Sequence, residues 1–367
     1  MKIAFVVPYF LPVVGGIETY IYELARRLSK DHAVYVFACG QGITESREGV
    51  KVFKLRAIDA QNLPFHLKIP YPIPMSLIFK LTRFDVDIIH AHGHAFAPSF
   101  LAGFASKLVH RPLVLTVHDI GIAYQDYLLT RGIRPFLDST LVNYAFRRAD
   151  AVVAQNDVTY TFALRFRPKR IVVIPQGVDL DRFKPCGMGE YVTFVSRLVP
   201  YKGGEVFIRA IPEVLKEVGD VKFRVIGDGF QRSFLEELAV DLGVGDSVEF
   251  LGGVPYQVVP RYLSQAKIVL SYFSGLVLLE AAAMQKPIIT TRNKWAKDAL
   301  GNNTLFVSMR GPEETANAII RLLKNPDERV RIAKLAYDMV TSERSWDMVA
   351  SRHIDLYDEV LSKSGRR

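Results

Sequence analysis

Two parts of the chain alternate apolar and amphipathic stretches in the same order. Residues 3–7 are apolar, a loop with two prolines and a Gly-Gly pair follows, and residues 17–28 are amphipathic. Residues 191–195 and 205–218 repeat this order around a second Gly-Gly pair. Short apolar runs predict buried strands, and a 3.6-residue period predicts helices. The repeat predicts an α/β protein of two similar domains that face each other across a cleft.

A strand-helix-strand unit in the second half carries a lone acid. Residues 267–272 and 287–291 predict parallel strands, and Glu280 is the one acid of the apolar helix between them. Burying an unpaired carboxylate is costly, so Glu280 is a candidate site, with a surface glutamate as the alternative. The helix starts at the carboxyl end of a strand, where open α/β sheets bind ligands. The amides that would face an anion there belong to Gly275, Leu276 and Val277.

A second candidate site follows the strand at residues 191–195. Arg197 and Lys202 lie in the loop between this strand and the second Gly-Gly pair. An arginine fork and a lysine point charge at a strand end are suited to a diphosphate. A solvated turn is the alternative for this pair alone.

The order of motifs resembles that of the family-four retaining glycosyltransferases, which have the GT-B fold of two Rossmann-like domains. The motifs run nearly end to end and include PYFLPVVGG, VDIIHAHGH, VLTVHD, ADAVVAQND, IVVIPQGVDLDRF, FVSRLVPYKGG, VIGDGF and GLVLLEAAAMQKPIITT. The resemblance implies transfer of a sugar from a nucleotide-sugar, with its anomeric configuration kept and without a metal or another cofactor. It places the donor in the C-terminal domain and the acceptor in the N-terminal one.

The resemblance also implies roles for single positions. Arg197 and Lys202 would hold the donor diphosphate, Glu280 would bind the ribose hydroxyls, and His118 would lie near the donor sugar. These four are the candidate catalytic residues. Further candidate donor-binding residues are Gly15, Gly16, Tyr272, Gly275, Leu276 and Val277, and candidate acceptor-binding residues are Tyr9, His92 and His94.

Tyr272 departs from the family pattern, because an acid that binds donor-sugar hydroxyls is expected there. A phenol has one oxygen and no charge, so an unsatisfied hydroxyl would cost about 1 to 3 kcal/mol. Either the donor differs, in which case Tyr272 lines the donor-sugar pocket, or the chain is a non-catalytic nucleotide-sugar-binding or scaffold subunit of the same fold. An epimerase of this fold agrees less well with the motif order.

The predicted domains are residues 1–185 for the acceptor and 186–344 for the donor, with a final helix at 345–367 that packs back on the first. Two cysteines are too few for a disulfide framework and indicate a reducing cytoplasm. No apolar run approaches the length of a spanning helix.

The net charge of +9 is concentrated in the first domain, where 23 basic residues face 15 acidic ones through Pro185. Residues 65–84 mix large apolar and basic side chains, which predicts either an ordinary core helix or an interfacial segment. An anionic inner membrane surface and a lipid-linked or glycan acceptor are therefore expected partners. Nucleic acid is not expected, because no nucleic-acid module is recognised. The basic cluster at 165–170 is interpreted as a solvated loop.

Overall fold

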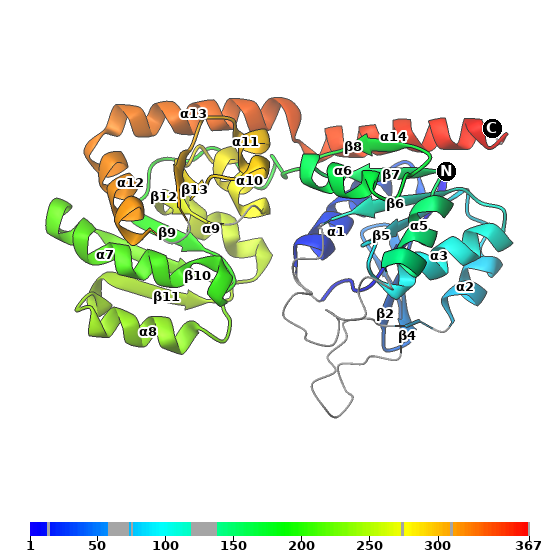
Figure 1. The fold of residues 1–367 in the computed structure, drawn as a ribbon, viewed down its shortest axis with the longest axis horizontal. Coiled ribbons are helices and arrows are strands. Elements are labelled where there is room, and N and C mark those ends of the chain that lie inside the picture. The colour runs from blue at the N-terminus through cyan, green and yellow to red at the C-terminus, as the bar shows by residue number, and fades with distance from the viewer. Residues whose placement is uncertain are drawn as a thin grey trace. The chain divides into compact units, whose positions relative to one another are not determined.

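The computed structural model describes residues 1–12, 15–57, 73–74, 76–118, 138–272, 275–308 and 311–365, with only the backbone at 138 and 139 (Figure 1). Contacts divide the chain into two compact units. Unit 1 comprises Met1–Gln176 and Trp346–Arg367, and unit 2 comprises Gly177–Ser345. The residues near Pro185 that were predicted to separate the domains lie in unit 2.

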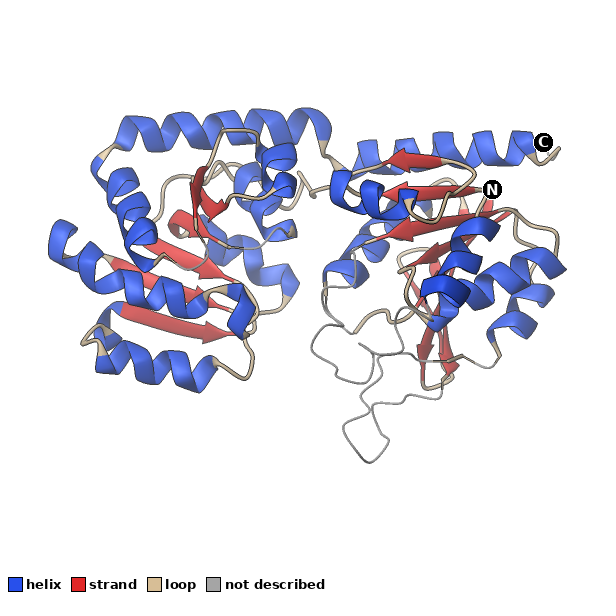
Figure 2. Ribbon diagram, viewed as in Figure 1, coloured by secondary structure: helices blue, strands red, loops and turns tan. Residues whose placement is uncertain are grey.

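Unit 1 is built on a sheet, with its strands red in Figure 2, and the described strands run in the order β3-β4-β2-β1-β5-β6-β7-β8. Neighbouring strands are parallel except for β3 and β4. The strands are β1 (Lys2–Val7), β2 (Ala33–Gly40), β3 (Thr44–Arg47), β4 (Val50–Arg56), β5 (Ile88–His92), β6 (Leu113–Val117), β7 (Ala151–Ala154) and β8 (Ile171–Val173).

Helices cover both faces of this sheet. Helices α2, α3, α5 and α6 share a hydrophobic core with one face, while α1 and α14 contact each other over the other face, where α14 bonds to β5. The final helix therefore belongs to unit 1. The bounds are α1 (Gly16–Leu28), α2 (Leu77–Arg83), α3 (Ala97–Leu108), α5 (Asn143–Arg148), α6 (Asp157–Leu164) and α14 (Trp346–Lys363).

Unit 2 is a parallel sheet in the order β11-β10-β9-β12-β13-β14. Helices α7, α8 and α12 share the core of one face, and α9, α10, α11 and α13 share that of the other. The strands are β9 (Tyr191–Val195), β10 (Lys222–Ile226), β11 (Val248–Gly252), β12 (Ala266–Leu270), β13 (Ile288–Thr291) and β14 (Leu305–Val307). The helices are α7 (Gly204–Val218), α8 (Arg232–Asp241), α9 (Val259–Ser264), α10 (Leu276–Ala283), α11 (Lys294–Leu300), α12 (Pro312–Lys324) and α13 (Pro326–Glu343).

Each sheet has a point where the strand order reverses. In unit 1 the chain adds strands on one side of β1 and then continues with β5 on the other side. In unit 2 the same reversal separates β9 from β12. Ligands of open α/β sheets bind beside the carboxyl ends of the strands at such a switch point. The topology therefore predicts ligand sites at the loops after β1 and β5 and at those after β9 and β12.

Candidate functional site

In unit 2 the predicted cations lie at the selected switch point. Arg197 follows β9 and is exposed, and its Nη2 donates to the Tyr201 hydroxyl at 3.3 Å. The Lys202 Nζ lies 5.6 Å from the centre of the Tyr201 ring. Burial, with a smaller contribution from the charge of Arg197, lowers the pKa of Lys202 to about 8. An anion bound between the two cations would raise the pKa of Lys202 again, because an opposite charge favours the protonated amine.

The amide end of α10 lies at the same switch point, after β12. Gly275 is the N-cap residue and has no side chain to cap the helix. The first amides of a helix lack acceptors within the helix and carry its positive dipole end. Glu280 lies one turn further on and is 4% exposed, so it is a buried acid in an apolar helix, as predicted. The structure therefore brings the amides of α10 and the loop of Arg197 and Lys202 to one edge of one sheet.

Glycine is required at position 203, where the Lys202 loop ends, for two reasons. Its φ of 77° is in the left-handed region, and a Cβ on it would lie 2.5 Å from Cδ2 of Tyr272. The Tyr272 ring lies under this loop with no exposed surface, and its hydroxyl donates to Thr315 Oγ1 at 3.0 Å. The ring also packs against Phe194 in the core. In this structure Tyr272 therefore offers no atom to a donor sugar, contrary to the expectation that it lines the sugar pocket.

The loop before α1 differs from a simple anion cradle. A Cβ on Gly15 would lie 2.4 Å from Oε2 of Glu18, so this carboxylate lies over Gly15 at the amide end of the helix. Glu18 is buried, and burial raises its pKa. A diphosphate that approached Gly15 and Gly16 would meet this carboxylate first.

In unit 1 His118 follows β6 and is held at both ring nitrogens. The Gln155 side-chain amide donates to His118 Nδ1 at 2.8 Å, and His118 Nε2 lies 3.1 Å from His92 Nδ1. Because Nδ1 accepts, the proton of His118 is on Nε2 and is donated to His92. Gln176 donates to the Gln155 carbonyl oxygen at 3.1 Å and fixes the orientation of the amide.

The proton of His92 must then be on Nε2, since its Nδ1 accepts. This nitrogen is buried and has no hydrogen-bond partner among the residues that the structure describes. Burial lowers the pKa of His92 well below its usual value and that of His118 to about 3. Both rings are therefore neutral at pH 7.

The histidine group continues to helix α14. His90 Nδ1 lies 2.6 Å from the Tyr357 hydroxyl, and His90 Nε2 lies 2.7 Å from Thr116 Oγ1. The His353 ring lies 3.3 Å from the Tyr20 hydroxyl through Nε2, and its Nδ1 donates to the Val349 carbonyl at 2.8 Å. Burial also lowers the pKa of His353, to about 4.

The other acceptor candidates of unit 1 lie in different surroundings. Tyr9 follows β1 and is half-buried, so it lies at the switch point. His94 is 2% exposed, and its ring packs against Phe146 and Phe162 on the face that α5 and α6 cover. His94 therefore contributes to packing, whereas His92 and His118 form one hydrogen-bonded pair.

Sequence reasoning missed Gln155, which bonds to His118, Tyr20, whose ring packs against both histidines, and His353, which bonds to Tyr20. Gln155 follows β7 at the carboxyl edge of the sheet, so the strand-end rule would have selected it. Tyr20 and His353 have no such signal, because 333 positions separate them. Across the described ranges, no group of three or more His, Cys, Asp or Glu side chains is arranged to hold a metal ion. None of the described helices is long and apolar enough to cross a membrane.

Two family models match the chain in series. The model described as Glycosyltransferase Family 4 matches residues 14–182, and the one described as Glycosyl transferases group 1 matches residues 182–339. The chain belongs to the group 1 glycosyltransferases. It is thus an enzyme of the glycosyltransferase class, as its motifs predict.

Curated relatives match this glycosyltransferase over nearly its whole length. One subunit of the phosphatidylinositol N-acetylglucosaminyltransferase from Arabidopsis thaliana is 27% identical over 100% of this chain and 83% of its own. GDP-mannose-dependent alpha-(1-6)-phosphatidylinositol monomannoside mannosyltransferase from Mycobacterium tuberculosis is 27% identical over 94% of this chain and 95% of its own.

Solved structures agree on the fold. Sucrose-phosphate synthase from Thermosynechococcus elongatus has a TM-score of 0.77 at 19% identity, covering 99% of this chain and 100% of its own. Anabaena HepE in complex with UDP-glucose has a TM-score of 0.76 at 20% identity, covering 98% of this chain and 100% of its own. The glycosyltransferase has the GT-B fold, which confirms the predicted fold class.

Proposed function

We propose that this glycosyltransferase moves a sugar from a nucleotide-sugar to a lipid-linked or glycan acceptor and keeps the anomeric configuration. The observation that carries the proposal is the edge of unit 2, where Arg197, Lys202 and the amide end of α10 meet at the switch point of the sheet. Anabaena HepE has been solved with UDP-glucose, and the M. tuberculosis relative is GDP-mannose-dependent. Both names support a nucleotide-sugar as the donor.

The chemistry follows from charge. When the bond between sugar and diphosphate breaks, negative charge develops on the leaving phosphate oxygen. Fixed cations and helix amides that face this oxygen stabilise the transition state more than the ground state. We propose that Arg197, Lys202 and the amides of Gly275, Leu276 and Val277 do this without a metal, and that Glu280 binds the ribose hydroxyls. Activity should therefore survive EDTA and should not rise when magnesium is added.

The acceptor is assigned to unit 1. Tyr9, His92 and His118 lie at the carboxyl edge of its sheet, and relatives with lipid acceptors in their names support a phospholipid or glycolipid. Two neutral histidines do not repel a cationic or neutral acceptor and offer no full charge to an anionic one. The proposal for this unit is therefore binding of a polyol or sugar headgroup by hydrogen bonds.

A peripheral position on the inner face of a cytoplasmic membrane is part of the proposal. Phe79 of α2 and Phe104 and Leu108 of α3 are 53%, 47% and 62% exposed, on two helices that contact each other. The guanidinium of Arg83 lies 3.7 Å from the centre of the Phe79 ring. Exposed apolar and basic side chains on neighbouring helices are typical of an interfacial surface. The predicted interfacial segment at 65–84 lies partly outside the described residues, since 65–72 and 75 are not described.

A scaffold subunit without turnover is the second candidate function. It is favoured by Tyr272, because the acid expected at this position is replaced by a side chain that is buried in the core. A subunit of this kind would bind nucleotide-sugar and release no product.

A panel of nucleotide-sugars tests the proposal. Binding of a ligand at a hundred times its dissociation constant adds ~2.7 kcal/mol to stability, which thermal unfolding detects. Wild type should be stabilised by one donor class, and Arg197→Ala should lose this effect. Lys216→Ala is the matched control, since Lys216 of α7 is exposed and pairs only with Glu213 among the described residues. Stabilisation without product would select the scaffold, and no stabilisation by any donor would contradict both functions.

A further inference from the structure

A second group of cations lies at the opposite edge of the unit 1 sheet. The amino ends of β6, β7 and β8 and the last turn of α14 enclose a cavity of about 450 Å³. His92 lies at the carboxyl end of β5 and His118 at that of β6, so this cavity is separate from the candidate acceptor residues. We call it the basic pocket, and its lining includes Arg111, Arg148, Asp150, Lys169, Arg170 and Lys363.

Charge in the basic pocket is unbalanced. Of the described side chains that line it, five are cations and Asp150 is the one carboxylate. Asp150 already accepts from Lys169 Nζ at 2.8 Å and from the backbone amide of Leu113 at 2.9 Å, with Arg148 at 3.5 Å. Carboxylates from outside the lining do not restore neutrality, because Glu359 is shared by Arg170 and Lys363. Arg111 pairs with Asp85, which also pairs with Lys2.

The cations retain unused donors. The Nε of Arg170 is buried and has no hydrogen-bond partner in the described part of the chain. The contacts of Arg148 are long, with 3.5 Å to the Asp150 carboxylate and 3.5 Å to the Arg111 carbonyl oxygen. Because the Arg170 Nε is buried, an anion in the pocket would be bound by the accessible donors of the cluster, chiefly those of Arg148 and Lys169.

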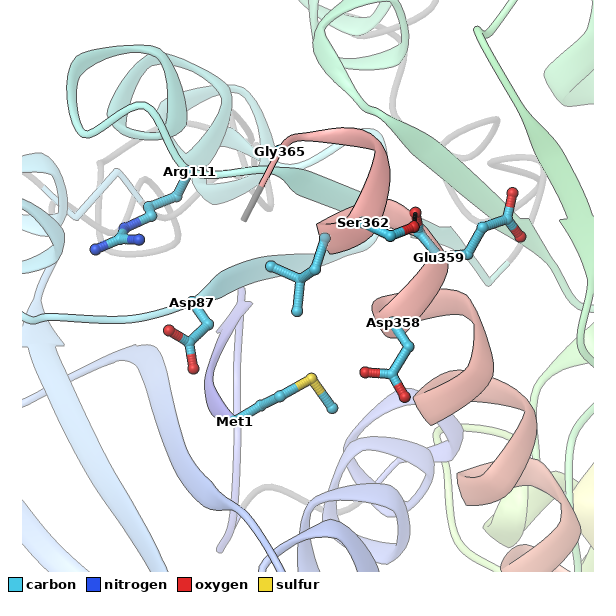
Figure 3. A pocket seen from close by; sticks show the side chains of 8 residues that line it. Met1, Asp87, Arg111, Asp358, Glu359, Ser362 and Gly365 are labelled. Atoms are coloured by element: carbon cyan, nitrogen blue, oxygen red, sulfur yellow. Dashed lines mark hydrogen bonds between the residues drawn. The ribbon is translucent and has the colours of Figure 1, made fainter. Parts of the chain in front are cut away.

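A neighbouring cavity of about 990 Å³ has the opposite character (Figure 3). Figure 3 shows Asp87 and Asp358 directed into it from two sides, with Arg111 at its border. Glu359 of α14 also lines it. Of the described groups around that cavity, Arg111 and the Met1 amino group are basic, against three carboxylates. The acidic cavity repels an anion, and the basic pocket on the other side of Arg111 attracts one.

From these observations we propose that the basic pocket binds a phosphate-bearing ligand. Guanidinium forks match the oxygens of a phosphate, and a lysine adds a point charge. The cavity is large enough for a phosphate with a small organic group. The cluster at residues 165–170, interpreted from sequence as a solvated loop, supplies Lys169 and Arg170 to this site. Bound phosphate would join the loops before β6, β7 and β8 to the end of α14.

Inorganic pyrophosphate is the probe, and calorimetry on the full chain is the measurement. Because pyrophosphate also suits Arg197 and Lys202 in unit 2, the titration uses the Arg197→Ala/Lys202→Ala protein. Binding should persist in this protein and should weaken about tenfold or more when Arg148→Gln and Lys169→Gln are added. Arg209→Gln with Lys216→Gln removes the same charge from exposed positions of α7 and should leave binding unchanged.

Misfolding would explain a loss of pyrophosphate binding but not a gain, so the design includes a variant that is expected to bind more tightly. Asp150→Asn removes the competing carboxylate and keeps an oxygen that accepts from the Leu113 amide, so pyrophosphate should bind more tightly. The proposal is overturned if Arg197→Ala/Lys202→Ala abolishes all pyrophosphate binding, or if neither the Arg148/Lys169 variant nor Asp150→Asn changes it. These results leave the nucleotide-sugar proposal for unit 2 untouched.

A second experiment distinguishes two sources of the phosphate, a lipid headgroup and a soluble compound. Vesicles of phosphatidylcholine containing phosphatidic acid are sedimented with the same proteins, with and without pyrophosphate. Capture that pyrophosphate displaces, and that Arg148→Gln/Lys169→Gln weakens, supports the proposal with a lipid headgroup as ligand. Pyrophosphate binding without such capture supports it with a soluble phosphate compound.

Discussion

The side-chain amide of Gln155 donates to His118 Nδ1 at 2.8 Å and so fixes the imidazole as its neutral Nε2–H tautomer. The donated Nε2 proton reaches His92, whose own Nε2 is buried without a partner among the described residues. Neither ring nitrogen of His118 is thus directed at a ligand in this state. A role near the donor sugar, which the motif implies, requires the bond to His92 to open or uses the backbone of His118.

Gln155→Leu should change the tautomer of His118. Without the amide, Nδ1 loses its donor, and a buried acceptor without a partner costs about 1 to 3 kcal/mol. We expect mixed tautomers in ¹⁵N NMR spectra of the imidazole and a fall in kcat of about tenfold or more. In Gln155→Glu, a carboxylate would accept from Nδ1–H and select the other tautomer. An unchanged His118 spectrum in both variants would mean that Gln155 does not position the ring.

Nucleoside diphosphate binding should weaken above pH 8. Burial and Arg197 lower the pKa of Lys202 to about 8, so this amine loses its proton well below the usual range of a lysine. The protonated form binds the diphosphate, and affinity should fall by up to tenfold per pH unit above 8. Lys202→Arg, which stays charged, should show a flat profile by calorimetry from pH 7 to 10. A flat profile in wild type would contradict the lowered pKa.

Tyr272→Phe should reduce stability and leave sugar preference unchanged. The Tyr272 hydroxyl donates to Thr315 in the core, and loss of this bond should cost about 1 kcal/mol in chemical denaturation. Tyr272→Glu would bury a carboxylate among apolar side chains and should unfold unit 2 at much lower denaturant. A switch of donor in Tyr272→Phe would instead place the phenol in the sugar pocket.

Unit 1 should lose stability as the pH falls below 6.5. The pKa values of His118 and His353 are lowered to about 3 and 4, and those of His90 and His92 are lowered well below their usual value. Between these values and 6.5 the unfolded chain binds protons that the folded one does not. Each such histidine lowers the free energy of unfolding by about 1.4 kcal/mol per pH unit.

Fluorescence of Trp346 reports on unit 1 alone if the other tryptophan, Trp295 in unit 2, is replaced by Phe. In this background, the urea concentration at the midpoint of unfolding should be lower at pH 5 than at pH 7. His353→Gln removes one titrating group. The slope of the free energy of unfolding against pH should therefore fall by the contribution of about one proton. A midpoint that is constant over this range would show that these histidines keep ordinary pKa values when folded.

Periodicity predicted the two Gly-Gly units and the strand-helix-strand unit around Glu280, while the resemblance to a known family implied the two-domain fold. The strands β9, β12 and β13 and the helix α7 occur within two residues of their predicted positions, because short apolar runs between Gly and Pro residues have few alternative structures. Arg197 and Lys202 were selected as candidates because a strand end followed by Gly-Gly is a local signal in the sequence.

The surroundings of the predicted residues were harder to infer. Tyr272 follows Ile268 and Leu270 at a spacing of two, and all three pack into the same core, so strand alternation pointed inward there while the family pattern pointed to the ligand. The contacts of His118, His92 and His90 join elements far apart in the chain. Such pairings depend on tertiary packing, which has no local pattern in the sequence.

Product formation from nucleotide-sugars tests the central claim most directly. Wild type, Arg197→Ala/Lys202→Ala and the control Lys216→Ala are incubated with several donors and a phospholipid acceptor, and the product is examined by NMR. Wild type and control should yield product with the anomeric configuration of the donor. The double variant should be slower by about 10² to 10⁴, from two contacts of about 1.5 to 3 kcal/mol each. Inverted product, equal rates in the double variant, or no turnover by wild type with any donor would contradict the account.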